Sequence, residues 1–145
     1  LQREGRLHTG AAAALEALAG RWPTALATGS TRESALHVLE RFGLRRHFDV
    51  VVGREDYARD KPAPDAFLRA AELLGVEPPE CVVIEDSYKG LTAARAARMC
   101  CIVVPNDYTR AGDFRGSAVL LGSMEELCCE VVERAFASVP AVSSP

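Results

Sequence analysis

Apolar residues along the chain follow two alternating patterns. Short apolar runs, several of them rich in β-branched residues, predict buried strands, and longer segments with apolar residues three or four positions apart predict helices. The predicted strands span residues 24–28, 48–52, 81–84, 101–104 and 118–121, and the predicted helices span residues 11–19, 31–42, 64–74, 90–98 and 124–135.

Glycine and proline separate many of these segments. Gly20, Gly43 and Gly75 follow three of the predicted helices, and glycine commonly ends a helix because it adopts left-handed backbone angles without strain. Pro78 and Pro79 predict a rigid turn before the third strand. Strands that alternate with helices form right-handed βαβ units, so we predict an α/β fold in which helices cover both faces of a parallel sheet.

Length and composition favour one globular domain. The 145 residues are 48% hydrophobic and 26% charged, and the net charge is −3 with acids and bases interspersed. We assign residues 1–137 to a core domain and residues 138–145 to a flexible C-terminal tail. The sequence has no basic face or tail that would favour nucleic acid as a partner, and no apolar run approaches the ~20 residues of a membrane span.

Five cysteines indicate the redox environment. Their number is odd, and no two of them have the spacing of a C-x-x-C pair or a zinc site. We therefore expect reduced, partly buried thiols in an intracellular protein, either cytoplasmic or organellar. The chain starts at Leu1 rather than at a methionine, and no targeting segment is visible in it.

Three predicted strand ends carry polar residues that suit ligand binding, because open parallel sheets bind ligands beyond the carboxyl ends of their strands. At the first, Thr28 is followed by Gly29 and Ser30 at a helix start. In one interpretation, the Thr28 hydroxyl and the amides of the next two residues form an anion cradle. The alternative is an ordinary strand-to-helix turn in which Ser30 or Thr31 caps the helix.

Lys61 is the second candidate, in the segment Lys61-Pro-Ala-Pro-Asp65. Two prolines stiffen the backbone around it, and a rigidly mounted ammonium group suits a phosphate or a cluster of carboxylates. The alternative is a solvated lysine in a proline-rich loop.

Glu85 and Asp86 are the third candidate, directly after the buried run of residues 81–84. Two acids at a buried strand end need a counter-charge, and carboxylate oxygens are ligands that suit Mg²⁺. Because adjacent strand residues point to opposite faces, we predict Asp86 as the direct Mg²⁺ ligand and Glu85 as a further ligand or a partner behind it. The alternative is that both acids cap the helix that follows.

These segments follow one another in a fixed order, each at a strand end or a helix start. Residues 26–30 (Leu-Ala-Thr-Gly-Ser), 61–65 and 83–91 (Val-Ile-Glu-Asp-Ser-Tyr-Lys-Gly-Leu) resemble the second, third and fourth motifs of the haloacid dehalogenase-like hydrolase superfamily. The resemblance is to the branch that contains β-phosphoglucomutases and phosphoglycolate phosphatases. It spans roughly residues 9–127 and implies a three-layer, Rossmann-like core.

The resemblance implies a role for each residue of the motifs. Thr28 and the Gly29 amide would bind the transferring phosphoryl group, and Lys61 would neutralise that group and the attacking carboxylate. Asp86, assisted by Glu85, would hold Mg²⁺. The implied activity is phosphoryl transfer from a small phosphorylated metabolite, of the sugar phosphate or phosphoglycolate class, through an aspartyl-phosphate.

One motif of the superfamily has no counterpart in these residues. The first motif, Asp-x-Asp at the end of the first strand, supplies the nucleophile and the general acid/base, but no two aspartates of this chain are separated by a single residue. We therefore expect a partial core that lacks this strand and most of the cap domain. In the superfamily the first strand lies between the strands that end here at Thr28 and Glu85. Without it, the two halves of the sheet must close against each other, accept a partner or leave a gap.

Two functions are predicted from these features. The first is a Mg²⁺-dependent phosphohydrolase or phosphomutase whose nucleophilic aspartate is not among the 145 residues. The second is a phosphate- and metal-binding module that retains Thr28, Lys61 and Asp86 but turns nothing over. We set aside a receiver-like or dinucleotide-binding domain, because the sequence shows neither the pattern of an acidic pocket with a strand-end nucleophile nor a Gly-x-Gly-x-x-Gly turn.

Overall fold

The computed structural model describes residue 7 and residues 9–138 of the chain. Helices and strands alternate through most of this part, and all strand pairs are parallel, as predicted. The strands are β1 (Ala25–Ala27), β2 (Val50–Val52), β3 (Val82–Glu85), β4 (Cys100–Val103) and β5 (Val119–Leu120), and the helices are α1 (Ala11–Ala19), α2 (Arg32–Arg41), α3 (Asp65–Leu74), α4 (Tyr88–Ala96) and α5 (Cys129–Ala137).

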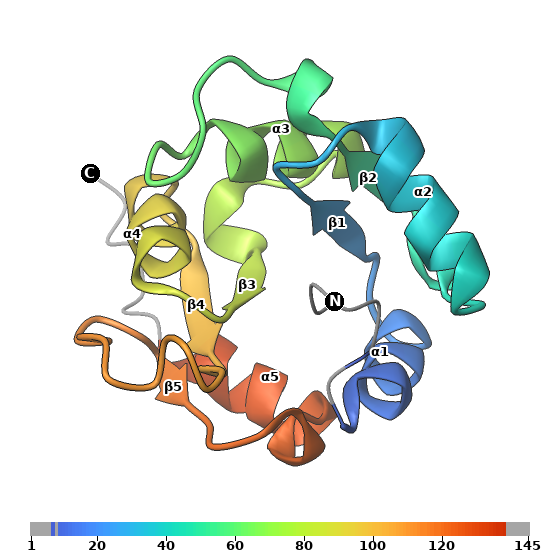
Figure 1. Cartoon of the computed structure of the whole chain (residues 1–145). Coiled ribbons are helices and arrows are strands. Elements are labelled where there is room, and N and C mark those ends of the chain that lie inside the picture. Colours follow the sequence, from blue (N-terminus) through green and yellow to red (C-terminus); the bar gives the residue numbers. More distant parts are fainter. Residues whose placement is uncertain (1–6, 8, 139–145) are drawn as a thin grey trace.

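The strands form two separate parallel sheets (Figure 1). β1 pairs with β2 in one sheet, and β3, β4 and β5 pair in that order in the other. β1 and β3 face each other in Figure 1 as the inner strands, yet no hydrogen-bonded ladder joins them within the described residues. The predicted α/β class is confirmed.

β4 is covered on both faces, as expected of a central parallel strand. Its side chains alternate in direction along the strand. Cys101 and Val103 belong to the buried cluster that α3 and α4 cover, whereas Ile102 belongs to the cluster that α1 and α5 cover. Helices therefore lie on both faces of the larger sheet, which confirms the predicted layering.

The smaller sheet packs against α2 and α3. Ala35 and Leu39 of α2 pack against Val51 of β2 in a third buried cluster. Thr31 caps α2 by accepting a hydrogen bond from the Ser34 amide (3.2 Å). Thr31 was one of the two predicted caps, and it starts the helix directly after the turn at the end of β1.

The last predicted helix differs from the structure. The segment over residues 124–135 divides into a 3₁₀-helix, η4 (Met124–Glu126), and α5. Leu127 and Cys128 between them have extended backbone angles, and the Leu127 side chain is buried beneath α1 and α5. The turn that buries Leu127 thus interrupts an apolar pattern typical of one continuous helix. Residues 139–145 of the predicted tail lie outside the described residues.

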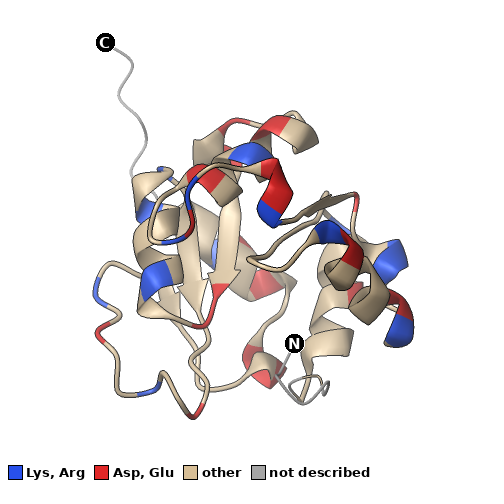
Figure 2. Cartoon of the chain, turned by 45° about the horizontal axis from the view of Figure 1, so that its top comes forward, with Lys and Arg blue, Asp and Glu red and all other residues tan. Residues whose placement is uncertain are grey.

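Charged side chains are distributed over the whole described chain. Figure 2 shows lysine and arginine interspersed with aspartate and glutamate. Surface pairs such as Arg21–Glu133 and Arg32–Asp56 join separate segments. In the part of the chain that the structure describes, every helix is too short or too polar to cross a membrane.

The five cysteines are free thiols of differing exposure, which predicts an order of reactivity. Cys128 is exposed, whereas Cys101 is buried and burial raises the pKa of its thiol to about 12. The reactive thiolate is therefore scarce at Cys101 in neutral solution. We expect a thiol reagent to modify Cys128 well before Cys101 in the folded protein, as measured by peptide mass spectrometry. Equal rates at both sites would contradict the burial of Cys101.

Candidate active site

The predicted site residues lie at the carboxyl ends of the two inner strands. Thr28 directly follows β1, Glu85 is the last residue of β3, and Asp86 comes next. The parallel ladder between β3 and β4 extends to this end, because the Val104 amide donates to the Glu85 carbonyl (2.8 Å). Side chains that follow β3 and β4 therefore start from neighbouring backbone positions.

The first strand end is a tight turn formed by Thr28, Gly29 and Ser30. Some of its hydrogen-bonding groups bond to each other within the turn. The Ser30 amide donates to the Thr28 hydroxyl oxygen (3.1 Å) and so is not directed outward as the predicted cradle requires. The space at Gly29 is open, since a Cβ added there would meet no atom within 4 Å. Neither the Thr28 hydroxyl proton nor the Gly29 amide is donated to an acceptor among the described residues. These two groups, together with the Ser30 hydroxyl, are the donors of the turn that remain for an anion.

Lys61 reaches the end of β3 and pairs with Glu85. Its Nζ lies 2.7 Å from Oε2 of Glu85, and the two side chains are 26% and 11% exposed. The ammonium group also lies 4.8 Å from the centre of the Phe67 ring, within the range of a cation–π interaction. The alternative of a freely solvated Lys61 is therefore wrong, and residues of two motifs meet at one strand end.

Both carboxylate oxygens of Glu85 have partners. Oε2 binds Lys61, and Oε1 accepts a hydrogen bond from the Asp86 amide (3.2 Å). Burial raises the pKa of Glu85, and the Lys61 ammonium opposes this rise by stabilising the ionised form. The contacts favour Glu85 as a partner that holds Lys61 over Glu85 as a direct metal ligand.

Neither acid caps α4, so the alternative role predicted for them is wrong. Ser87 caps the helix by accepting a hydrogen bond from the Gly90 amide (3.1 Å). Gly90 lies against Glu85, and a Cβ at this position would clash with Cγ and Cδ of the glutamate side chain. The glycine of the segment 83–91 therefore leaves the space that the glutamate occupies.

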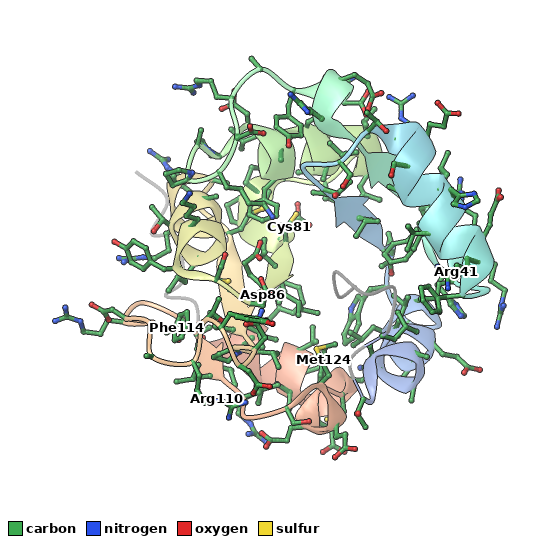
Figure 3. All side chains as sticks on the ribbon, in the orientation of Figure 1. Arg41, Cys81, Asp86, Arg110, Phe114 and Met124 are labelled. Carbon is green, nitrogen blue, oxygen red and sulfur yellow. The ribbon has the colours of Figure 1, made fainter. Side chains whose placement is uncertain are left out.

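Asp86 has a side-chain partner that the sequence analysis missed. Its Oδ2 accepts a hydrogen bond from Nδ2 of Asn106 (2.9 Å), and Figure 3 shows Asp86 beside β3 and β4. Asn106 follows the strand predicted over residues 101–104 after a single proline, Pro105. The strand-end rule that selected Asp86 would have selected Asn106 as well.

The loop that carries Lys61, just before α3, is held by further residues that the sequence analysis did not select. The Tyr57 hydroxyl lies 3.1 Å from the Thr28 carbonyl oxygen and 3.1 Å from Oδ1 of Asp60, two acceptors that share one proton. The pKa of Tyr57 is raised, mainly by burial of the hydroxyl and to a smaller extent by the neighbouring Asp60 carboxylate. Arg59 pairs with Asp65 (3.0 Å), so Asp65 closes this loop onto α3. The contact between Tyr57 and Thr28 joins residues 29 positions apart, so it leaves no local sequence signal.

The carboxylates at this edge fit a divalent cation only in part. The described residues contain no group of three or more His, Cys, Asp and Glu side chains placed to hold a metal. Mg²⁺ at phosphate sites commonly takes one or two carboxylates together with water and phosphate oxygens. Asp86 fits this pattern, because Asn106 holds Oδ2 and no hydrogen bond from the described residues reaches Oδ1.

One family of known proteins matches the part of the chain that carries Thr28, Lys61, Glu85 and Asp86. The model of the haloacid dehalogenase-like hydrolase family matches residues 1–98. Fructose-1-phosphate phosphatase YqaB of Escherichia coli (strain K12) is 49% identical over 80 residues, which are 55% of this chain and 43% of the relative. Hexitol phosphatase B of the same strain is 44% identical over 84 residues, covering 55% of this chain and 38% of the relative.

Solved structures share the fold. The structure of CbbY from Rhodobacter sphaeroides in complex with phosphate has a TM-score of 0.76 at 37% identity, covering 83% of this chain and 56% of that protein. β-Phosphoglucomutase from Clostridium difficile has a TM-score of 0.76 at 25% identity, covering 88% of this chain and 55% of that protein. The chain thus spans little more than half the length of these proteins, and less of the curated relatives.

Proposed function

We infer that this chain provides part of the active site of a phosphatase. The chain belongs to the haloacid dehalogenase-like hydrolase family and to its branch of phosphatases and β-phosphoglucomutases. The proposed substrate is a small phosphorylated metabolite of the sugar phosphate or phosphoglycolate class. The ion pair between Lys61 and Glu85 beside Asp86 carries the proposal, because it joins residues of two motifs at one strand end (2.7 Å).

In this proposal the two strand ends bind and orient the phosphoryl group. The Thr28 hydroxyl and the Gly29 amide donate hydrogen bonds to its oxygens, and the Lys61 ammonium neutralises the charge that builds up on them. Ser30 contributes to the turn through its bond to the Thr28 hydroxyl oxygen. Glu85 holds Lys61 in place through the 2.7 Å contact, so that the cation is positioned before the substrate arrives.

Asp86 is the residue of this chain that would hold Mg²⁺. The bound cation supplies positive charge that stabilises the equatorial phosphoryl oxygens. Glu85 supports the site through Lys61 and through the Asp86 amide, since both of its oxygens are engaged there. A single carboxylate from this chain is compatible with a Mg²⁺ site that is completed by water, phosphate and a further carboxylate.

The nucleophile is proposed to lie on a further strand, because the 145 residues contain no Asp-x-Asp pair. We place that strand between β1 and β3, each of which pairs on one edge only within the described residues. Ala27 of β1 packs against the cluster that contains Val83 of β3, so the two strands border the same core.

The proposed reaction has two steps. The aspartate oxygen attacks phosphorus while the bond to the leaving oxygen breaks, and that oxygen takes up a proton from the second aspartate. Water then gives a proton back to the second aspartate as it attacks phosphorus of the aspartyl-phosphate, which releases phosphate and restores the carboxylate.

The position of the nucleophile is tested by comparing two lengths of protein. We expect residues 1–145 alone to release no phosphate from p-nitrophenyl phosphate, and a protein that includes the proposed Asp-x-Asp strand to release it. A panel of fructose 1-phosphate, a hexitol phosphate, 2-phosphoglycolate and xylulose 1,5-bisphosphate then identifies the substrate class by kcat/KM. Turnover by residues 1–145 that is lost in Lys61→Ala would contradict a nucleophile on a further strand.

A second function is a phosphate- and metal-binding module without turnover. The lack of an Asp-x-Asp pair among the 145 residues favours it. It predicts binding of inorganic phosphate and Mg²⁺ that depends on Lys61 and Asp86, with no phosphate release at either length of protein. Phosphate release that Asp86→Ala abolishes would reject this function.

A further inference from the structure

Asn106 lies beyond the carboxyl end of β4 and reaches the end of the neighbouring strand. β3 and β4 pair in parallel with Glu85 opposite Val103, so the residues that follow them leave the sheet side by side. Nδ2 of Asn106 donates to Oδ2 of Asp86 at 2.9 Å, and both side chains are half-buried. The contact joins two strand ends that are 20 residues apart in the sequence.

The loop around Asn106 sets the orientation of its amide. Oδ1 accepts hydrogen bonds from the amides of Tyr108 (2.8 Å) and Thr109 (3.0 Å), and the main-chain amide of Asn106 donates to the Thr109 hydroxyl (2.9 Å). A flipped side chain would place its NH₂ group against two N–H donors and its oxygen against the Asp86 carboxylate. Nδ2 is therefore the atom that faces Asp86.

A neutral donor at this place fixes the carboxylate without cancelling its charge. Oδ2 of Asp86 is engaged by Asn106, and no hydrogen bond from the rest of the described chain reaches Oδ1. A lysine or arginine here would pair with the carboxylate and compete with a cation for it. Residues that hold a ligand from behind in this way orient it and increase metal affinity.

From this geometry we propose that Asn106 is a positioning residue that orients Asp86 to bind a divalent cation. The proposal rests on the proposed function, because it takes Asp86 as the metal-binding carboxylate. Asn106 acts through Asp86 and contacts neither the cation nor the phosphate itself.

The test measures Mn²⁺ binding to the purified protein by electron paramagnetic resonance, without turnover. We expect Asn106→Ser and Asn106→Ala to raise the Kd for Mn²⁺ about tenfold. Serine is the better matched of the two replacements. Its hydroxyl can accept hydrogen bonds from the main-chain amides of the turn, but its side chain is too short to reach Asp86. Thr92→Val is the control, because it removes a hydroxyl that bonds only to the Tyr88 carbonyl within α4 (2.9 Å), so its Kd should stay within about twofold of the wild type.

Nuclear magnetic resonance of the ¹⁵N-labelled protein gives a second readout, in which the response of Asn106 to the metal is followed in the wild type itself. The side-chain NH₂ signals of Asn106 are identified by their absence from the spectrum of Asn106→Ser. We expect them to shift as Mg²⁺ is added, in step with saturation of the metal site, and to stay fixed in Asp86→Ala.

The outcomes separate this inference from the proposed function. A Kd within about twofold of the wild type in both Asn106 variants, or NH₂ signals that do not move, would overturn the role of Asn106 while loss of binding in Asp86→Ala still supports the metal site. Mn²⁺ binding that Asp86→Ala leaves unchanged would overturn both the metal site and the positioning role.

Discussion

Replacing Lys61 with methionine is expected to lower the rate of phosphate release by a protein that includes the proposed Asp-x-Asp strand about 100- to 1000-fold, the effect of removing one preorganised charge-stabilising group. The ammonium group is held at the end of β3, 2.7 Å from Glu85, where charge would build up on the phosphoryl oxygens. Methionine keeps an unbranched side chain beside the Phe67 ring, so the variant removes the charge and retains most of the packing. Steady-state kinetics gives kcat for both proteins.

The chain offers a matched control in its other lysine. Lys89 lies on α4 with an exposed side chain, and Lys89→Met should leave kcat within about twofold of the wild type, as is usual for surface substitutions. Equal rates for Lys61→Met and Lys89→Met would contradict a role for the Lys61 charge in catalysis.

Lys61→Met also changes how stability depends on pH. Burial raises the pKa of Glu85 and Lys61 opposes the rise, so removal of the ammonium group raises this pKa further. A carboxyl whose pKa is higher in the folded state than its ordinary 4.5 contributes stability that is fully present below that value and is lost as the pH rises through the folded-state pKa. The variant should therefore match the wild type in acid and lose stability relative to it towards neutral pH.

Urea denaturation at a series of pH values measures this difference in the free energy of unfolding. The deficit at neutral pH should remain below the ~3–5 kcal/mol typical of an unpaired buried charge, because Glu85 can take up a proton instead. A deficit that is constant with pH would show that the loss comes from packing and not from the charge pair.

The strand ends of the site could be located from the sequence because the rule behind them is geometric. Parallel strands place their carboxyl ends at one edge, so Glu85 and Asp86 were found from a buried run followed by two acids. Lys61 was predicted from the two prolines that stiffen its segment. It contacts Glu85 although α3 lies between the two residues in the sequence. The pairing partner itself was not predictable, since phosphate or any carboxylate would have satisfied the same reasoning.

Other features depend on contacts that a local pattern does not contain. The Ser30 amide turns inward to the Thr28 hydroxyl oxygen, although the same three residues suit an outward cradle. Leu127 is buried by α1, and that contact divides what its periodicity predicts as one helix. The burial of Leu127 is packing between distant segments, which overrides local propensity. The bond between Ser30 and Thr28 is a local alternative that the same three residues also allow.

Gly90→Ala is expected to displace Glu85 from Lys61, although alanine ordinarily favours a helix over glycine by about 1 kcal/mol. A Cβ at this position of α4 would clash with Cγ and Cδ of Glu85. Glu85 belongs to β3 and its backbone is held by the ladder to β4, so the side chain has to leave and its 2.7 Å contact with Lys61 is lost. We expect the free energy of unfolding to fall by about 1–3 kcal/mol.

Two controls isolate the contact. Gly20→Ala adds a methyl group at the end of α1, where the nearest atom is 3.4 Å away, and should change stability by no more than about 0.5 kcal/mol. Glu85→Ala vacates the space beside Gly90, so Gly90→Ala should cost little in that background, and the double-mutant cycle should show a coupling of about 1–3 kcal/mol. An equal cost in both backgrounds would contradict the contact.

The double variant also separates packing from catalysis. In the double variant of Glu85→Ala and Gly90→Ala the clash is gone, so the free energy of unfolding should recover relative to Gly90→Ala alone. Lys61, however, has lost the Glu85 carboxylate that its ammonium group contacts at 2.7 Å in the wild type. The rate of phosphate release by the protein that includes the proposed Asp-x-Asp strand should therefore stay low, at the level of Gly90→Ala alone. Recovery of stability without recovery of rate would assign Glu85 to the positioning of Lys61, whereas recovery of both would show that the glycine serves packing alone.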